Sequence, residues 1–133
     1  MEQEHIEGFF KKDRFAQCVG IELLEASKGG ARAKMKIEDH HLNAVGIVHG
    51  AAIFALADLV FAMASNSHGT VAVAVNASIS FLKATSGGTL FAEAKEVSRN
   101  SKLASYTIRV TDEGGDLIAI FQGMVYRKKD KIE

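Results

Sequence analysis

The sequence of 133 residues contains no proline, a single cysteine (Cys18), and acidic and basic side chains in equal number, so its net charge is zero. A single cysteine excludes an internal disulfide framework and any cysteine-based metal site, and it fits a reducing compartment, so we expect a cytoplasmic protein. Balanced charge offers no broad basic surface that would attract nucleic acid, and none is expected as a partner. This length predicts one domain over residues 1–133.

Long hydrophobic runs are also missing. The most apolar segment, residues 51–64, is shorter than the roughly 20 residues that a membrane span needs, and it carries Asp58 near its middle. The N-terminus is acidic and is followed by no long apolar core, so it does not read as a secretory signal. We therefore predict no association with a membrane.

The sequence does contain helical patterns in two places. Residues 1–17 combine charges with Ile6, Phe9, Phe10 and Phe15, which predicts an N-terminal helical segment. Residues 51–64 are apolar on nearly every face, so this helix should be buried on most sides. Gly69 follows it and suits a left-handed C-terminal cap.

The remaining segments alternate apolar and polar residues with the period of two that strands require. The predicted strands cover residues 19–23, 31–37, 71–81, 89–97, 103–111 and 117–126. This order predicts an α+β fold in which a curved antiparallel sheet wraps around one long buried helix. One helix cannot cover both faces of such a sheet, and small residues at even positions of 71–81 suit close contact with a second copy. We expect a homodimer at least, and predict a homotetramer.

Two features of the helix point to chemistry. Asp58 is the only charged residue in the run 51–64, and a buried carboxylate without a partner costs several kcal/mol, so it requires a partner, water or a function. The structural alternative is a half-exposed aspartate that holds a local hydrogen bond. Gly50, at the N-terminus of the helix, leaves its backbone N–H open to an anion or a developing oxyanion.

The spacing of these two residues constrains the site. Eight residues of helix place Gly50 and Asp58 about 12 Å apart, too far for both to touch one reacting carbonyl. If two copies pack about a two-fold axis with antiparallel helices, Gly50 of one copy can meet Asp58 of the other. The site would then be composite.

The motif Asn43-x-x-Gly46-x-x-His49-Gly50, followed by Leu56-Ala57-Asp58, resembles the PaaI-like (phenylacetate-degradation type) acyl-CoA thioesterases of the hot-dog fold. The similarity covers most of the chain from about residue 15. It implies hydrolysis of an acyl-CoA thioester to free acid and CoA at a subunit interface, without a cofactor other than the CoA of the substrate. It also implies roles for three residues: Asp58 as nucleophile or general base, the Gly50 amide as the group that polarises the carbonyl, and Asn43 as a positioning residue for water or the carbonyl.

Asn76 and His49 are two further candidates, as supporting residues of the site. Ala74 stands where some members of the family carry a hydroxyl side chain, and Asn76 is the residue that could compensate. His49 precedes the helix, where a histidine more often fixes backbone groups than performs acid–base chemistry, although its titration near neutral pH keeps the second role open.

The cations at strand ends and turns are candidate contacts for the CoA phosphates, for which such side chains are natural partners. The alternative is that they serve solubility. The predicted CoA-binding residues are Arg99, Ser101, Lys102 and Lys128. His40 and His41 are expected to be solvated loop residues, and their spacing matches no metal site, so no metal is predicted.

We expect an aryl or medium-chain acyl group. Several apolar side chains could line a tunnel for this group, or they could simply belong to the core. These are Ile47, Phe54, Phe61 and Met63. Two rival functions stay open. A hot-dog hydratase or dehydratase is disfavoured because its histidine motif typically includes prolines, which this chain lacks. A non-catalytic acyl-CoA binding module would bind without turnover, and it is disfavoured because the chain has no room for an output domain.

Overall fold

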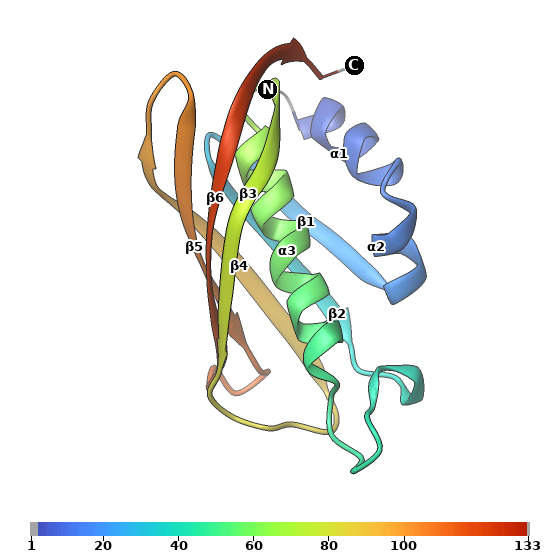
Figure 1. The fold of residues 1–133 in the computed structure, drawn as a ribbon. Coiled ribbons are helices and arrows are strands. Elements are labelled where there is room, and N and C mark those ends of the chain that lie inside the picture. The colour runs from blue at the N-terminus through green and yellow to red at the C-terminus, as the bar shows by residue number, and fades with distance from the viewer. Residues whose placement is uncertain (1–2, 133) are drawn as a thin grey trace.

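A computed structural model describes residues 3–132 as one antiparallel sheet wrapped around a long helix, α3 (Gly50–Asn66) (Figure 1). In the order in which they lie in the sheet, the strands are β1 (Ile21–Ser27), β2 (Gly30–Lys36), β4 (Thr89–Arg99), β5 (Leu103–Thr111), β6 (Leu117–Lys131) and β3 (Thr70–Phe81). All neighbouring strands pair antiparallel, and β1 and β3 form the two edges. The predicted α+β hot-dog architecture is therefore confirmed.

Helix α3 is held by the sheet through one broad apolar face. Leu56, Ala57 and Val60 are fully buried, and the helix packs against strands β2, β4 and β3. Burial of apolar surface, at about 25 cal/mol per Å², is what fixes so hydrophobic a helix against the sheet. The opposite side, which includes Ala51 and Asp58, is exposed in the single chain. The helix is thus buried on most sides, as predicted, and one stripe is left uncovered.

The N-terminal segment forms two helices, α1 (Gln3–Lys11) and α2 (Arg14–Val19), where the sequence predicted one helical segment. The break falls at Asp13, whose Oδ1 accepts a hydrogen bond from the Ala16 N–H at 2.9 Å and caps α2. Residues 1 and 2 of the predicted segment lie outside the described residues. The first strand begins at Ile21, later than predicted, because Gly20 ends α2 in the left-handed region at φ 89°.

Strand β3 departs from simple alternation. A bulge lies between Ala74 and Asn76, because Ala74 pairs with Val125 while Asn76 pairs with Met124. Val125 is buried and Met124 is exposed, so Ala74 faces α3 whereas Asn76 faces the outside of the sheet. The prediction that small residues at even positions share one face is therefore wrong, since a single extra residue reverses the alternation.

Candidate functional site

The loop before α3 is held in shape by Asn43. Its Oδ1 accepts hydrogen bonds from the backbone N–H groups of Val45, at 3.0 Å, and Ile47, at 3.3 Å. The Asn43 N–H donates to the Ile47 carbonyl at 2.8 Å, which closes the loop. Within residues 3–132 the amide nitrogen of the Asn43 side chain forms no hydrogen bond, so it can still donate to a ligand.

His49 is the N-terminal cap of α3. Its Nδ1 accepts a hydrogen bond from the Ala51 N–H at 2.9 Å. One of the orphan donors of the first helical turn is thereby bound, which is the structural role that sequence reasoning placed first for this residue.

Gly50 is the first residue of α3, and two observations fit it to bind an oxyanion. Among the described residues no acceptor bonds its backbone N–H, which carries the positive end of the helix dipole. A Cβ at this position would lie 3.0 Å from Cζ of Phe81. Glycine is therefore needed for close packing against the Phe81 ring as well as for access to the N–H.

Asp58 lies two turns further along the exposed stripe of α3. Its carboxylate faces a groove of about 560 Å³ that also contains Gly50, and the groove is lined by Phe15, Phe54 and Phe81. Within residues 3–132 the carboxylate has no hydrogen-bond donor and no cationic partner, so the structural alternative of a local hydrogen bond finds no support. The predicted burial applies to the helix and not to Asp58 itself, which is exposed in the single chain.

The electrostatics of the groove act on this carboxylate. Desolvation by the surrounding atoms and repulsion from the Asp13 carboxylate raise the pKa of Asp58 above the ordinary value of 3.8. A carboxylate with a raised pKa is a better base and nucleophile once it is ionised. The groove therefore presents a reactive, unpaired carboxylate beside apolar surface.

A second hollow, of about 370 Å³, adjoins the groove on the other side of Gly50. Asn43 and Ile47 line it, and it shares Gly50 and the Phe81 ring with the groove that contains Asp58. The structure therefore brings Asn43, Gly50 and Asp58 to adjoining surfaces around the first turns of α3, with the Phe81 ring between the two hollows.

Other predicted residues lie elsewhere in the single chain. Asn76 is on the outer face of the sheet, in a hollow that it shares with Ser78 and Gln122, so it does not reach Asp58 within one chain. The four predicted CoA-binding residues gather in and beside the turn between β4 and β5, at the end of the molecule where α3 terminates (Figure 1). The single chain therefore separates them from Gly50 by the length of α3.

The apolar candidates for a tunnel divide into two groups. Phe61 and Met63 are 1% exposed and belong to the core. Phe54 lines the groove of Asp58, and Ile47 lines the hollow of Asn43. Only the second pair can contact a ligand.

One of the two loop histidines, His41, differs from the prediction. His41, in the short 3-10 helix η1 (Asp39–His41), is only 3% exposed. Its Nδ1 accepts from the Glu38 N–H at 2.9 Å, and its Nε2 lies 2.6 Å from the Val19 carbonyl, to which it donates. His41 is thus a buried structural residue that ties the loop to α2. His40 remains exposed, and no cluster of three metal-ligating side chains occurs within residues 3–132.

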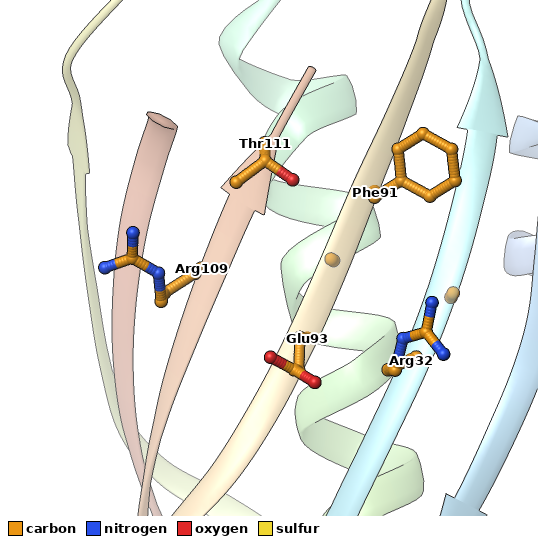
Figure 2. A pocket seen from close by; sticks show the side chains of 7 residues that line it. Arg32, Phe91, Glu93, Arg109 and Thr111 are labelled. Atoms are coloured by element: carbon orange, nitrogen blue, oxygen red, sulfur yellow. The ribbon is translucent and has the colours of Figure 1, made fainter. Parts of the chain in front are cut away.

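Another hollow lies on the outer face of the sheet, away from α3 (Figure 2). Arg32 and Arg109 lie directly across from Glu93 on the neighbouring strands, so that two cations flank one carboxylate. This hollow holds no helix N-terminus.

Sequence reasoning did not single out Phe15 and Phe81, which line the groove of Asp58, because their place there depends on contacts between elements far apart in the chain.

Similar proteins identify the family of this chain. The Thioesterase superfamily matches residues 45–119. A protein of Archaeoglobus fulgidus that carries the provisional name of an esterase is 44% identical over 119 residues, 89% of this chain and 77% of the relative. The acyl-coenzyme A thioesterase PaaI of Escherichia coli is 30% identical over 125 residues, 93% of this chain and 89% of that protein.

Solved structures give the same result. The structure of E. coli PaaI superposes with a TM-score of 0.93, covering 98% of this chain and 95% of that one. A protein of Streptococcus mutans solved with acetyl-CoA is 25% identical with a TM-score of 0.80, covering 86% and 92%. The fold and these relatives define a hot-dog thioester hydrolase. The chain belongs to the thioesterase superfamily, and within it is a PaaI-like acyl-CoA thioesterase.

None of the helices in residues 3–132 combines the length and apolar character needed to cross a membrane.

Proposed function

We propose that this protein hydrolyses the thioester of aryl- or medium-chain acyl-CoA in a composite site formed by two copies of the chain. The observation that carries the proposal is the unpaired Asp58 carboxylate in a groove that also holds the free Gly50 N–H. The residues act without a metal or a further cofactor, and the single exposed Cys18 fits a cytoplasmic location.

The dimer is supported by the free edge of the sheet. Strand β3 is 12 residues long and lies at an edge, and Val73 and Val75 on it are 44% and 56% exposed. A long apolar edge is an unsatisfied template for pairing, and a second copy of β3 would complete it. Antiparallel pairing of two β3 strands places the α3 helices antiparallel on one side, and the outer faces of two such dimers can pack to form a tetramer.

The antiparallel helices supply the geometry that one chain lacks. Gly50 and Asp58 of one chain are about 12 Å apart along the helix, whereas Gly50 of one chain and Asp58 of its partner can approach the same carbonyl. The Gly50 N–H binds the carbonyl oxygen and stabilises the oxyanion as it forms. The Asn43 amide donates to the same oxygen or to water.

The reaction consumes one water and releases a carboxylic acid and CoA thiol. Asp58 of the partner chain either attacks the carbonyl carbon, forming an anhydride that water then hydrolyses, or removes a proton from the water that attacks. In both cases the C–S bond breaks and the thiolate takes up a proton. Phe54 and Ile47 provide the apolar surface for an aryl or medium-length acyl group.

The test is the release of free thiol from aromatic and straight-chain acyl-CoAs by wild type and Asp58→Asn. We expect turnover to fall at least about a thousandfold in the variant, because the reacting group is removed. Asp130→Asn, a matched change at an exposed site on β6, should retain full activity. Undiminished turnover by Asp58→Asn would reject the assignment of Asp58, and the best substrate identifies the acyl class.

A further inference from the structure

A network of polar and charged side chains surrounds Glu96 at the C-terminal end of α3. The Oε2 atom of Glu96 accepts hydrogen bonds from the Tyr106 hydroxyl at 2.9 Å and from Nε2 of His68 at 2.6 Å. Its Oε1 atom accepts from Nε of Arg99 at 3.1 Å. Three donors from three different segments therefore converge on one carboxylate.

The carboxylate is fixed from several sides. The Glu96 side chain is 20% exposed, and Tyr106 is 1% exposed. The turn between β1 and β2 lies against it, since a Cβ at Gly29 would collide with Oε2 of Glu96. Burial alone would raise the pKa of Glu96, but the hydrogen bonds from His68 and Tyr106 outweigh burial, and the pKa is lowered. Glu96 is thus an immobile anion.

Arg99 is the most exposed member of the network. Its side chain is 42% exposed and is held through Nε. Within residues 3–132 its two terminal nitrogens form no hydrogen bond, so the outer edge of the guanidinium keeps four N–H donors. A guanidinium presented in this way matches two oxygens of a phosphate group, and prior anchoring lowers the entropy lost on binding.

The position of Arg99 suits the composite site. Glu96 contacts His68, two residues past the end of α3, so the network lies about 12–15 Å beyond Asp58 at 1.5 Å per residue. Where two α3 helices run antiparallel, this end of one helix lies beside the N-terminal end of its partner. The pantetheine arm of CoA separates the thioester from the phosphates, so Arg99 lies on the side to which the phosphates extend.

We propose that Glu96 is a positioning residue for coenzyme A: it holds Arg99 through Nε so that the terminal nitrogens of the guanidinium bind a phosphate group of the substrate. The inference rests on the proposed composite site. Replacement of a residue that merely supports the fold would affect substrates with and without phosphates equally. Replacement of Glu96 should affect only the substrate that carries phosphates.

The experiment compares two substrates that carry the same acyl group, an acyl-CoA and the corresponding acyl-pantetheine, which lacks phosphates. For Glu96→Gln we expect KM for acyl-CoA to rise about tenfold, equivalent to about 1.4 kcal/mol, with kcat nearly unchanged. KM for acyl-pantetheine should not change. Glu93→Gln, on the outer face of the same strand (Figure 2), is the matched control and should leave both KM values unchanged.

A double-variant cycle tests whether Glu96 acts through Arg99. Arg99→Gln should raise KM for acyl-CoA at least as much, and adding Glu96→Gln to it should have no further effect. Arg99→Lys, which keeps the charge but loses the Nε contact, should also raise KM for acyl-CoA. This variant replaces Glu96→Gln in the test if Glu96→Gln does not fold.

Equal changes of KM for the two substrates, or additive effects in the double variant, would overturn the proposal. Failure of wild type to hydrolyse either substrate would overturn the proposed function, and this inference with it. Normal wild-type turnover with an unchanged KM in Glu96→Gln would overturn this inference alone.

Discussion

The two ends of helix α3 are built in opposite ways. At the N-terminal end, the Gly50 N–H and the Asn43 side-chain amide have no partner within residues 3–132, and the surrounding surface is apolar. At the C-terminal end, Asn66 and Ser67 are buried, and both are hydrogen-bonded. Polar groups are abundant at both ends, but within the described residues the groups that terminate the helix itself are left available only at the first end.

This difference indicates that the bonded groups contribute to stability and that the open groups serve the reaction. Ser67 Oγ donates to the Ala64 carbonyl at 2.7 Å and accepts from the Gly29 N–H at 2.8 Å, which ties the end of the helix to the turn between β1 and β2. Buried polar groups that are fully bonded rigidify a fold. Donors left unbonded beside an apolar groove cost stability and are retained where they bind a reacting group. The comparison predicts that changes at the open groups of Gly50 and Asn43 alter turnover, and that changes at the bonded groups of Asn66 and Ser67 alter stability.

Among changes at the two ends of α3, the largest effect is expected at the N-terminal end, from Gly50→Ala. The added Cβ meets the Phe81 ring at 3.0 Å, so the ring or the helix terminus must shift and the N–H is displaced from the carbonyl oxygen. We expect kcat/KM for acyl-CoA to fall about tenfold to a hundredfold, since a displacement near 1 Å can cost a factor of a hundred. Thermal stability should be kept, because alanine is the better helix former.

The matched control for Gly50→Ala is the pair Gly50→Ala/Phe81→Leu, which opens space at the ring. Recovery of activity in the pair assigns the loss to the Phe81 contact. A loss of stability in Gly50→Ala without a loss of turnover would contradict the contrast between the two ends.

The sequence predicted more about the N-terminal end than about the C-terminal end. Asp58 and Gly50 were found because a lone charge and a helix-initiating glycine are local signals, and the period of α3 is local too. The Glu96 network joins α3 to strands β4 and β5, and nothing in the sequence indicates that these residues meet.

The errors have the same physical origin. Burial of His41 depends on its hydrogen bond to the Val19 carbonyl, 22 residues away. The bulge next to Ala74 is visible only in the pairing with β6, so alternation alone placed Ala74 and Asn76 on the same face. Local periodicity predicts elements, whereas the register between strands decides which side chains face the site.

A second prediction concerns the C-terminal end, where Ser67→Ala should reduce stability and leave turnover unchanged. The change leaves the Gly29 N–H buried without an acceptor, at a cost of about 1–3 kcal/mol. Urea unfolding followed by circular dichroism measures the loss. Ser65→Ala removes only a donor to the Ala62 carbonyl and should cost much less. A Ser67→Ala protein of full stability but reduced kcat would contradict the assignment of Ser67 to stability alone.

The smallest effect is expected from the pH dependence of stability at Asp58. Its pKa is raised in the folded chain, so the folded state holds the proton more tightly than the unfolded state, and ionised Asp58 destabilises the fold. Asp58→Asn should therefore raise Tm at neutral pH, by about 2 °C given solvent screening. The gain should shrink as the pH falls through the raised pKa, and vanish below the ordinary value of 3.8, where both states are protonated. Tm measured between pH 3 and 7 for both proteins tests the sign. A variant less stable than wild type at neutral pH would show that Asp58 supports the fold, and the division between a reactive end and a stabilising end of α3 would not hold.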